Sequence, residues 1–70
     1  MLTPRQLECY NAMRDFSENN GYMPSYEQLR EILGVHGKSA IHGMIVRMEQ
    51  RGAIERLPYK SRAIRLLPLN

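Results

Sequence analysis

Residues 34–52, GVHGKSAIHGMIVRMEQRG, decide how this chain folds. Large apolar side chains recur there at the i, i+3, i+4, i+7 spacing of one helical face, at Ile41, Met44, Ile45 and Met48. The opposite face is small, polar or basic and has no acidic residue; it carries Lys38, Ser39, Ala40, His42, Gly43, Val46 and Arg47. The pattern predicts a helix over residues 39–51 with one apolar side and one slim, basic side.

A helix over residues 4–19 is predicted by its start signal. Thr3 suits the N-cap, Pro4 the first helical position and Gln6 the third, where its amide closes a capping box. Gly21 can adopt the left-handed conformation that ends such a helix. The expected apolar face consists of Leu7, Tyr10, Met13 and Phe16, with Cys9 beside it as a small buried hydrophobe.

A second, shorter helix is predicted between Ser25 and Gly34. Ser25 and Gln28 form another capping-box pair, and Gly34 is the expected terminator. The apolar face of this helix consists of Leu29, Ile32 and Leu33. A short turn over residues 34–38 joins it to the helix over residues 39–51, so the pair is expected to form a helix-turn-helix.

Two short runs near the C-terminus, residues 53–57 and 62–66, read as strands separated by turn residues. Two strands alone are marginally stable, so this hairpin is expected to pack on the helices. Three helices followed by a hairpin predict a mainly α (α+β) fold, the winged helix-turn-helix. A chain of 70 residues has room for a single domain, over residues 1–70.

Charge is distributed unevenly along the chain. Residues 1–35 contain three Lys/Arg and five Asp/Glu, whereas residues 36–70 contain seven and two, so the halves carry −2 and +5 and sum to +3. Positive charge gathered in one half is typical of proteins that bind polyanions, although solubility alone also explains it. The single cysteine leaves no internal disulfide and no cysteine pair for zinc. The longest apolar run has three residues, which predicts no membrane span.

The ordered series of motifs resembles the N-terminal DNA-binding domain of the LexA repressor family over nearly the whole chain. The matching pieces are residues 2–6, 14–15, 21–25, 33–34, 51–55 and 61–67. The resemblance implies a cytoplasmic, sequence-specific transcriptional regulator, a repressor of bacterial or phage type that needs no cofactor. The family's C-terminal self-cleaving, dimerising domain has no counterpart in these residues, so cleavage-triggered induction is not implied.

The base-reading face departs from the family pattern. Family members carry an asparagine and acidic residues there, whereas this chain has Ser39, His42 and Gly43. The wing has Pro58, Tyr59 and Lys60 where the family tends to have small residues and glycine. We therefore expect an operator sequence that differs from that of the family.

The candidate DNA contacts follow from the docking geometry of such domains. A recognition helix inserts its N-terminal half into the major groove, so the helix over residues 39–51 is expected there, with the wing over residues 58–62 on the backbone or in the minor groove. Lys38 and Arg47 are candidate phosphate contacts, and the start of the second helix can hold another phosphate. The full candidate set is Ser25, Tyr26, Gln28, Lys38, Ser39, Ala40, His42, Gly43, Arg47, Tyr59, Lys60 and Arg62.

Several of these residues also have a purely structural interpretation. Ser25 and Ser39 could simply cap their helices, and Tyr59 could pack on the hairpin stem. Arg47 could pair with Glu49 as a solvated charge. Gly43 costs a helix about 1 kcal/mol relative to alanine, and close approach of DNA, tight packing against a partner or simple sequence drift would explain it.

Two hypotheses of different classes result. The first is a regulator that occupies double-stranded DNA. A palindromic operator bound by a homodimer is expected, because one small module has a small interface, with pairing through the DNA or through an edge of the hairpin. The second is a protein-interaction module, a phage-type antagonist or a subunit of a complex. An enzyme is not expected, because His36 and His42 lie on different faces and no phosphate-binding glycine loop follows a strand. No metal or small-molecule ligand is expected either.

Overall fold

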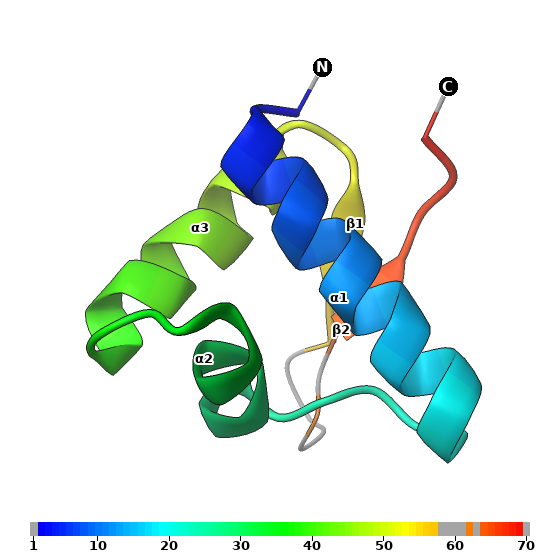
Figure 1. The fold of residues 1–70 in the computed structure, drawn as a ribbon. Helices are drawn as coiled ribbons and strands as arrows, with labels where there is room; N and C mark the ends of the chain where they lie inside the picture. The colour runs from blue at the N-terminus through cyan, green and yellow to red at the C-terminus, as the bar shows by residue number, and fades with distance from the viewer. Residues whose placement is uncertain (1, 58–61, 63, 70) are drawn as a thin grey trace.

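The computed structural model describes residues 2–57, 62 and 64–69. Three helices, α1 (Pro4–Asn20), α2 (Tyr26–Leu33) and α3 (Lys38–Gln50), precede two strands, β1 (Ile54–Arg56) and β2 (Ile64–Leu66) (Figure 1). The strands pair antiparallel, with Ile54 opposite Leu66 and Arg56 opposite Ile64. This is the predicted winged helix-turn-helix with a hairpin as its wing. Within the described residues, no helix is long and apolar enough to cross a membrane.

The starts of α1 and α2 are both closed by the predicted capping boxes. In α1, the Gln6 N–H donates to Thr3 Oγ1 at 3.2 Å, and the Thr3 N–H donates to Gln6 Oε1 at 3.1 Å. In α2, the same reciprocal pair joins Gln28 and Ser25, at 3.1 and 3.0 Å. Each helix ends in a left-handed glycine, as predicted, although α1 continues one residue further than expected.

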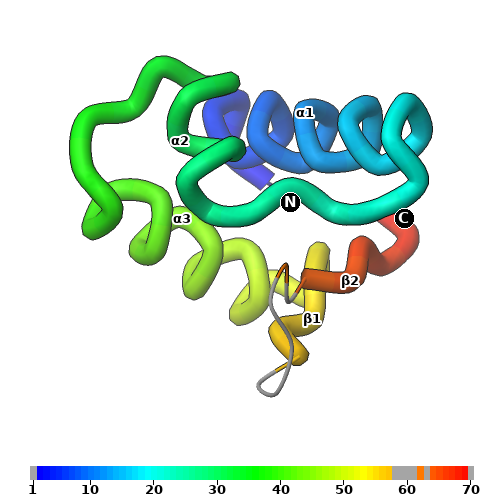
Figure 2. The backbone as a smooth tube through the Cα atoms, turned by 90° about the horizontal axis from the view of Figure 1, so that it is seen from below, coloured from blue at the N-terminus to red at the C-terminus, as the bar shows by residue number. Residues whose placement is uncertain are grey.

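One hydrophobic core is shared by the three helices and the hairpin, whose arrangement Figure 2 shows from below. Its fully buried side chains come from every helix and from β1; they include Cys9, Met13, Leu29, Ile41, Ile45, Met48 and Ile54. Cys9 is the predicted buried hydrophobe, and burial raises the pKa of its thiol to about 11. A neutral thiol at this position contributes packing to the core and is a poor nucleophile.

The apolar faces predicted for α1 and α2 were partly wrong. Leu7 is 42% exposed and Ile32 is 50% exposed, whereas the polar Gln6 is 6% exposed. In α1, the capping box holds the Gln6 amide inward, and the Tyr10 hydroxyl donates to the Leu67 carbonyl at 2.7 Å. These two contacts set the rotation of α1 about its axis, and Leu7 consequently lies outside. In α2, which has only eight residues, Leu29 is the one fully buried side chain.

The two strands are shorter than the predicted runs, with three residues each. Ala53 lies just outside β1: its N–H donates to the Met48 carbonyl at 3.0 Å, while its carbonyl still accepts from Leu67 at 2.9 Å, in register with the strand pair. The first of these bonds ties the hairpin directly to the end of α3. The position of the hairpin is therefore coupled to the helix expected to read DNA.

Candidate nucleic-acid interface

The start of α3 is exposed and has no side-chain cap. Its N-cap is Gly37, whose φ of 84° is open to glycine and rare for other residues, and no side chain accepts a hydrogen bond there. This conformation lets the helix begin at Lys38, one residue earlier than predicted. Ser39 therefore occupies the second helical position, and its interpretation as the cap is wrong. The first-turn N–H groups of a helix need partners from outside it, so this end is open to a ligand.

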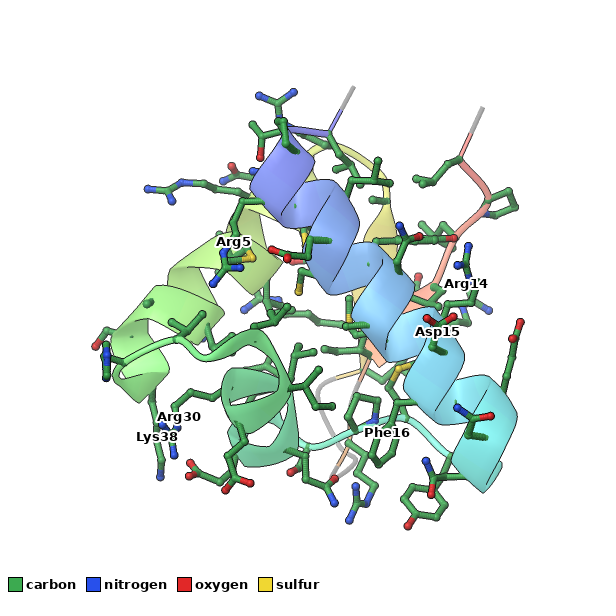
Figure 3. The ribbon with its side chains drawn as sticks, viewed as in Figure 1. Arg5, Arg14, Asp15, Phe16, Arg30 and Lys38 are labelled. Carbon is green, nitrogen blue, oxygen red and sulfur yellow. The ribbon has the colours of Figure 1, made fainter. Side chains whose placement is uncertain are left out.

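The two faces of α3 differ as the periodicity predicted. Ile41, Ile45 and Met48 are fully buried, and Met44 is half-buried. On the other side Lys38, Ser39, Ala40, His42 and Arg47 are all exposed, and Gly43 is partly so. Figure 3 shows Lys38 projecting from the start of α3, on the other side of the molecule from Arg14 and Asp15. The slim, basic face is thus accessible over the first three turns of the helix.

A shallow depression connects this face with the start of α2. It is lined by five predicted site residues, Tyr26, Lys38, Ser39, His42 and Gly43. The rings of Tyr26 and His42 lie with their centroids 6.4 Å apart and inclined by 50°. Burial raises the pKa of the Tyr26 hydroxyl above its usual value, so this group is a neutral hydrogen-bond donor at physiological pH. The structure thus brings together two segments that the sequence placed in one interface.

Gly43 has open space around it. A Cβ added there would meet no atom within 4 Å, apart from the helix's own backbone nearby. Packing inside the chain therefore does not require glycine at this position, although glycine costs a helix about 1 kcal/mol relative to alanine. The open space at Gly43 leaves room for close approach of a partner to this face of α3.

Ion pairs neutralise only part of the positive charge in the basic half of the chain. Its acidic residues, Glu49 and Glu55, pair with Arg56 and Arg65 at 2.8 and 2.7 Å. Arg47 therefore does not pair with Glu49, and neither Lys38 nor Arg47 has an ion pair with a described residue. The net charge of +5 in residues 36–70 therefore includes the two exposed cations Lys38 and Arg47.

Glu49 is held as an anion by its partner. The Arg56 N–H donates to Glu49 Oε2 at 3.1 Å and its Nε donates to Oε1 at 2.8 Å. The backbone N–H, followed by the guanidinium, lowers the pKa of the Glu49 carboxyl below its usual value. The contact links the end of α3 to β1 and neutralises a carboxylate that would otherwise repel a polyanion from this helix.

The remaining predicted residues either make hydrogen bonds within the chain or lie outside the described residues. Ser25 and Gln28 are engaged in the capping box of α2. Arg62, predicted to face DNA from the wing, donates instead to the Met23 carbonyl at 3.2 Å and to Gln28 Oε1. Tyr59 and Lys60 lie outside the described residues. Sequence reasoning missed the role of Gly37, although a glycine directly before a basic helix start was a usable signal.

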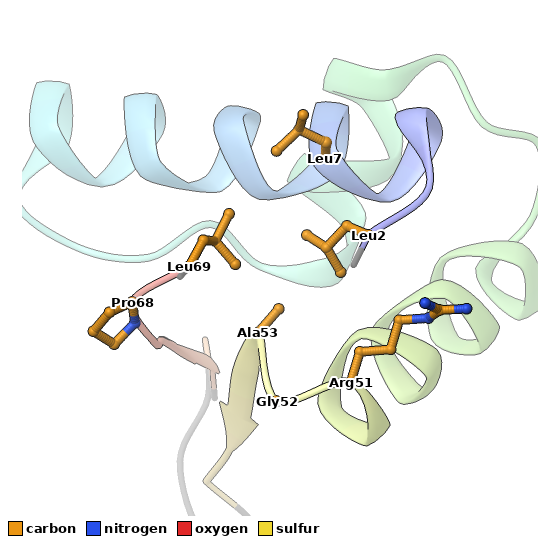
Figure 4. Close-up of a pocket in the computed structure, with 7 residues that line it drawn as sticks. All are labelled: Leu2, Leu7, Arg51, Gly52, Ala53, Pro68 and Leu69. Atoms are coloured by element: carbon orange, nitrogen blue, oxygen red, sulfur yellow. The ribbon is translucent and has the colours of Figure 1, made fainter.

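An apolar depression lies apart from this surface, between the start of α1, the junction after α3 and the C-terminal segment. It is lined by Leu2, Leu7, Arg51, Gly52, Ala53, Pro68 and Leu69. Figure 4 shows Leu2 and Leu69 projecting into the space between α1 and the junction at Ala53. None of the predicted site residues lines it, so it is not part of the candidate interface.

The fold and the exposed, basic start of α3 define a winged helix-turn-helix domain of the nucleic-acid-binding class. The sequence model of the LexA DNA-binding domain matches residues 1–63. The LexA repressor of Syntrophobacter fumaroxidans is 43% identical over 70 residues, which cover 99% of this chain and 34% of that protein. The LexA repressor of Staphylococcus aureus (strain USA300) is 39% identical over 66 residues, which cover 94% and 32%. This chain belongs to the LexA DNA-binding domain family and spans about a third of the length of these relatives.

Proposed function

We propose that this chain binds double-stranded DNA sequence-specifically, as the DNA-binding part of a bacterial transcriptional repressor acting in the cytoplasm. The observation that carries the proposal is the start of α3, which is exposed, basic and without a side-chain cap. Recognition helices insert this end into the major groove, where partial positive charge from unpaired N–H groups favours phosphate. The two relatives named above, both called LexA repressors, support the assignment of repression.

The residues divide by what they can reach. Lys38 and Arg47 are exposed cations without ion pairs among the described residues, and they neutralise phosphates on either side of the groove. Ser39 and His42 lie on the exposed face of the first two turns and contact base edges; a ring nitrogen of His42 suits a guanine or a phosphate. Ala40 and Gly43 have no bulk, so the helix can lie close to the base pairs.

The start of α2 supplies a second contact with the DNA backbone. Tyr26 lines the same depression as Lys38 and His42, and its hydroxyl is a neutral donor. The Ser25 hydroxyl and the Gln28 amide hold the capping box, which keeps the first turn of α2 in place beside α3. A phosphate bound here would fix the angle at which α3 enters the groove.

The operator should be specific to this chain. Its base-reading positions hold Ser39, His42 and Gly43, in place of the asparagine and acidic residues of the family pattern. A single winged domain buries a small interface, so tight binding needs two copies on paired half-sites. We therefore expect a palindromic operator whose half-sites differ from those bound by the family.

Selection from a random pool of double-stranded DNA tests this proposal. We expect a palindromic consensus to emerge, with an affinity that falls steeply between 50 and about 200 mM salt as phosphate contacts are screened. Lys38→Ala should reduce the slope of log affinity against log salt by about 0.9, whereas the matched removal of one charge in Arg14→Ala should not. The absence of any enriched sequence would favour the alternative, a protein-interaction module that uses the same face.

A further inference from the structure

Arg62 connects the hairpin to the segment between α1 and α2. It lies two residues before β2, yet its guanidinium donates to the Met23 carbonyl at 3.2 Å and to the side-chain carbonyl of Gln28. The same guanidinium lies over the Tyr22 ring, 4.7 Å from its centroid. All three partners belong to residues 22–28, some 34 or more positions earlier in the chain. The contact therefore joins the hairpin to the residues at and before the start of α2.

The contact meets the capping box of α2. Gln28 Oε1 accepts two hydrogen bonds, one from the Ser25 N–H at 3.0 Å and one from Arg62. A charged donor makes the stronger type of hydrogen bond, so Arg62 holds the amide in the orientation that the cap requires. Because α2 leads directly into the turn before α3, a tie at this point fixes the hairpin relative to the helix-turn-helix.

The backbone conformation and the charge of Arg62 are both unfavourable at this position unless its contacts compensate for them. Its φ of 57° is in the left-handed region, which costs energy for a residue with a Cβ. Its positive charge also lies at the N-terminal end of α2, where the helix dipole is unfavourable for a cation. Arginine at this position is explained if the three contacts offset both penalties.

We propose that Arg62 is a positioning residue: it latches the hairpin to the start of α2, so that the hairpin and α3 meet DNA in one fixed arrangement. This differs from the direct DNA contact that its place in the wing suggested. Only the effect of Arg62 on DNA binding rests on the proposed function. The latch itself is a property of the free protein and can be tested without DNA.

A double-mutant cycle in the DNA-free protein provides the first test. Gln28→Glu keeps an acceptor for the capping box and gives Arg62 a carboxylate partner, so it should raise the melting temperature by about 2–4 °C. In the Arg62→Leu background the same substitution should give at most half of that gain. Any effect of the new charge on the helix dipole is common to both backgrounds and cancels. Equal gains in the two backgrounds would overturn the latch, even if the domain proved not to bind DNA.

The salt dependence of DNA binding provides the second test. Arg62→Leu should weaken binding by about fivefold while leaving the slope of log affinity against log salt at the value of its control. The control is Arg65→Leu, which removes the same charge from an exposed β2 residue paired with Glu55. A slope that falls below that of the control by about 0.9 would identify a phosphate contact and overturn the proposal. An unchanged affinity would overturn it as well.

Discussion

The two helices of the helix-turn-helix begin in opposite ways. At α2, the Ser25 hydroxyl accepts from the Gln28 N–H, and the Gln28 side-chain oxygen accepts from the Ser25 N–H. Arg62 donates a third hydrogen bond to the same Gln28 oxygen. At α3, Gly37 offers no side chain, and the exposed residues that follow are Lys38, Ser39 and Ala40. Glycine is a tolerated N-cap that costs only about a few tenths of a kcal/mol relative to serine, so α3 can begin without a side-chain cap. The start of α2 is thus closed by its own side chains, whereas the start of α3 leaves its first N–H groups open to the DNA that we propose it binds.

The largest expected loss of DNA binding comes from replacing the exposed polar and charged side chains of α3. Replacing Lys38, His42 and Arg47 together by alanine should weaken binding to the selected duplex by at least about 100-fold and lower the salt slope by about 1.8. Stability should change little, because all three side chains are exposed. The control, Arg14→Ala with Arg65→Ala, also removes two positive charges, but from exposed ion pairs that contribute little. An equal loss of binding in the control would mean that total charge, and not the face of α3, determines affinity.

The next effect separates stability from binding at a single residue. Gly43→Ala should raise the free energy of unfolding by about 0.5–1 kcal/mol, since the added methyl meets no neighbour and glycine weakens a helix. The same methyl should weaken DNA binding by about tenfold if the helix lies against the base pairs. Urea melts and titrations of the duplex measure both quantities.

Gly21→Ala provides the control for that substitution. Gly21 has a φ of 78°, so alanine there should destabilise the domain without touching the proposed interface. If Gly43→Ala stabilised the domain and left binding intact, close approach of DNA to α3 would be refuted.

The two serines test the comparison directly. Ser25→Ala removes the cap of α2 and should lower the free energy of unfolding by about 1 kcal/mol. Ser39→Ala should leave stability unchanged or slightly raised, because Ser39 caps nothing and alanine favours helices. Only the second substitution should change which bases are preferred in the operator. Thermal melts of both variants, with one repeated selection, distinguish these outcomes.

The smallest effect concerns the pH dependence of the paired charge at the other end of α3. The pKa of Glu49 is lowered in the folded state, so its pair with Arg56 stabilises the protein fully above pH 4.5, the usual pKa of a glutamate. That stabilisation is lost as the pH falls from there through the lowered pKa. Glu49→Gln should flatten the decline in melting temperature over this range and leave DNA binding at neutral pH unchanged. A decline as steep as in the parent would show that other carboxyl groups cause it.

Local signals predicted the helix boundaries well. The capping boxes at Thr3 and Ser25 involve partners three residues apart, and the glycines that end α1 and α2 act on their own backbone. Such short-range chemistry is written directly in the sequence. The apolar face of α3 was predicted equally well, because Ile41, Ile45 and Met48 follow one clear period.

Features set by distant contacts could not be predicted in the same way. Leu7 and Ile32 were expected inside and are exposed, because contacts far along the chain, such as Tyr10 with Leu67, fix how the helices are turned. The early start of α3 is a different case, because it depends on the positive φ of Gly37, a local signal that the apolar period does not contain. Arg62 resembled a wing cation in sequence, yet its partners lie more than thirty residues away.

The most direct test of the account is an NMR titration of the protein with its selected duplex. If the open start of α3 enters the major groove, the largest amide shifts should fall on residues 38–43 and at Tyr26 beside them. The outer face of α1, around Arg14 and Asp15, should remain unchanged. Shifts concentrated on α1, or around Leu7 and Leu69 at the apolar depression, would contradict the proposal that α3 is the DNA-reading helix.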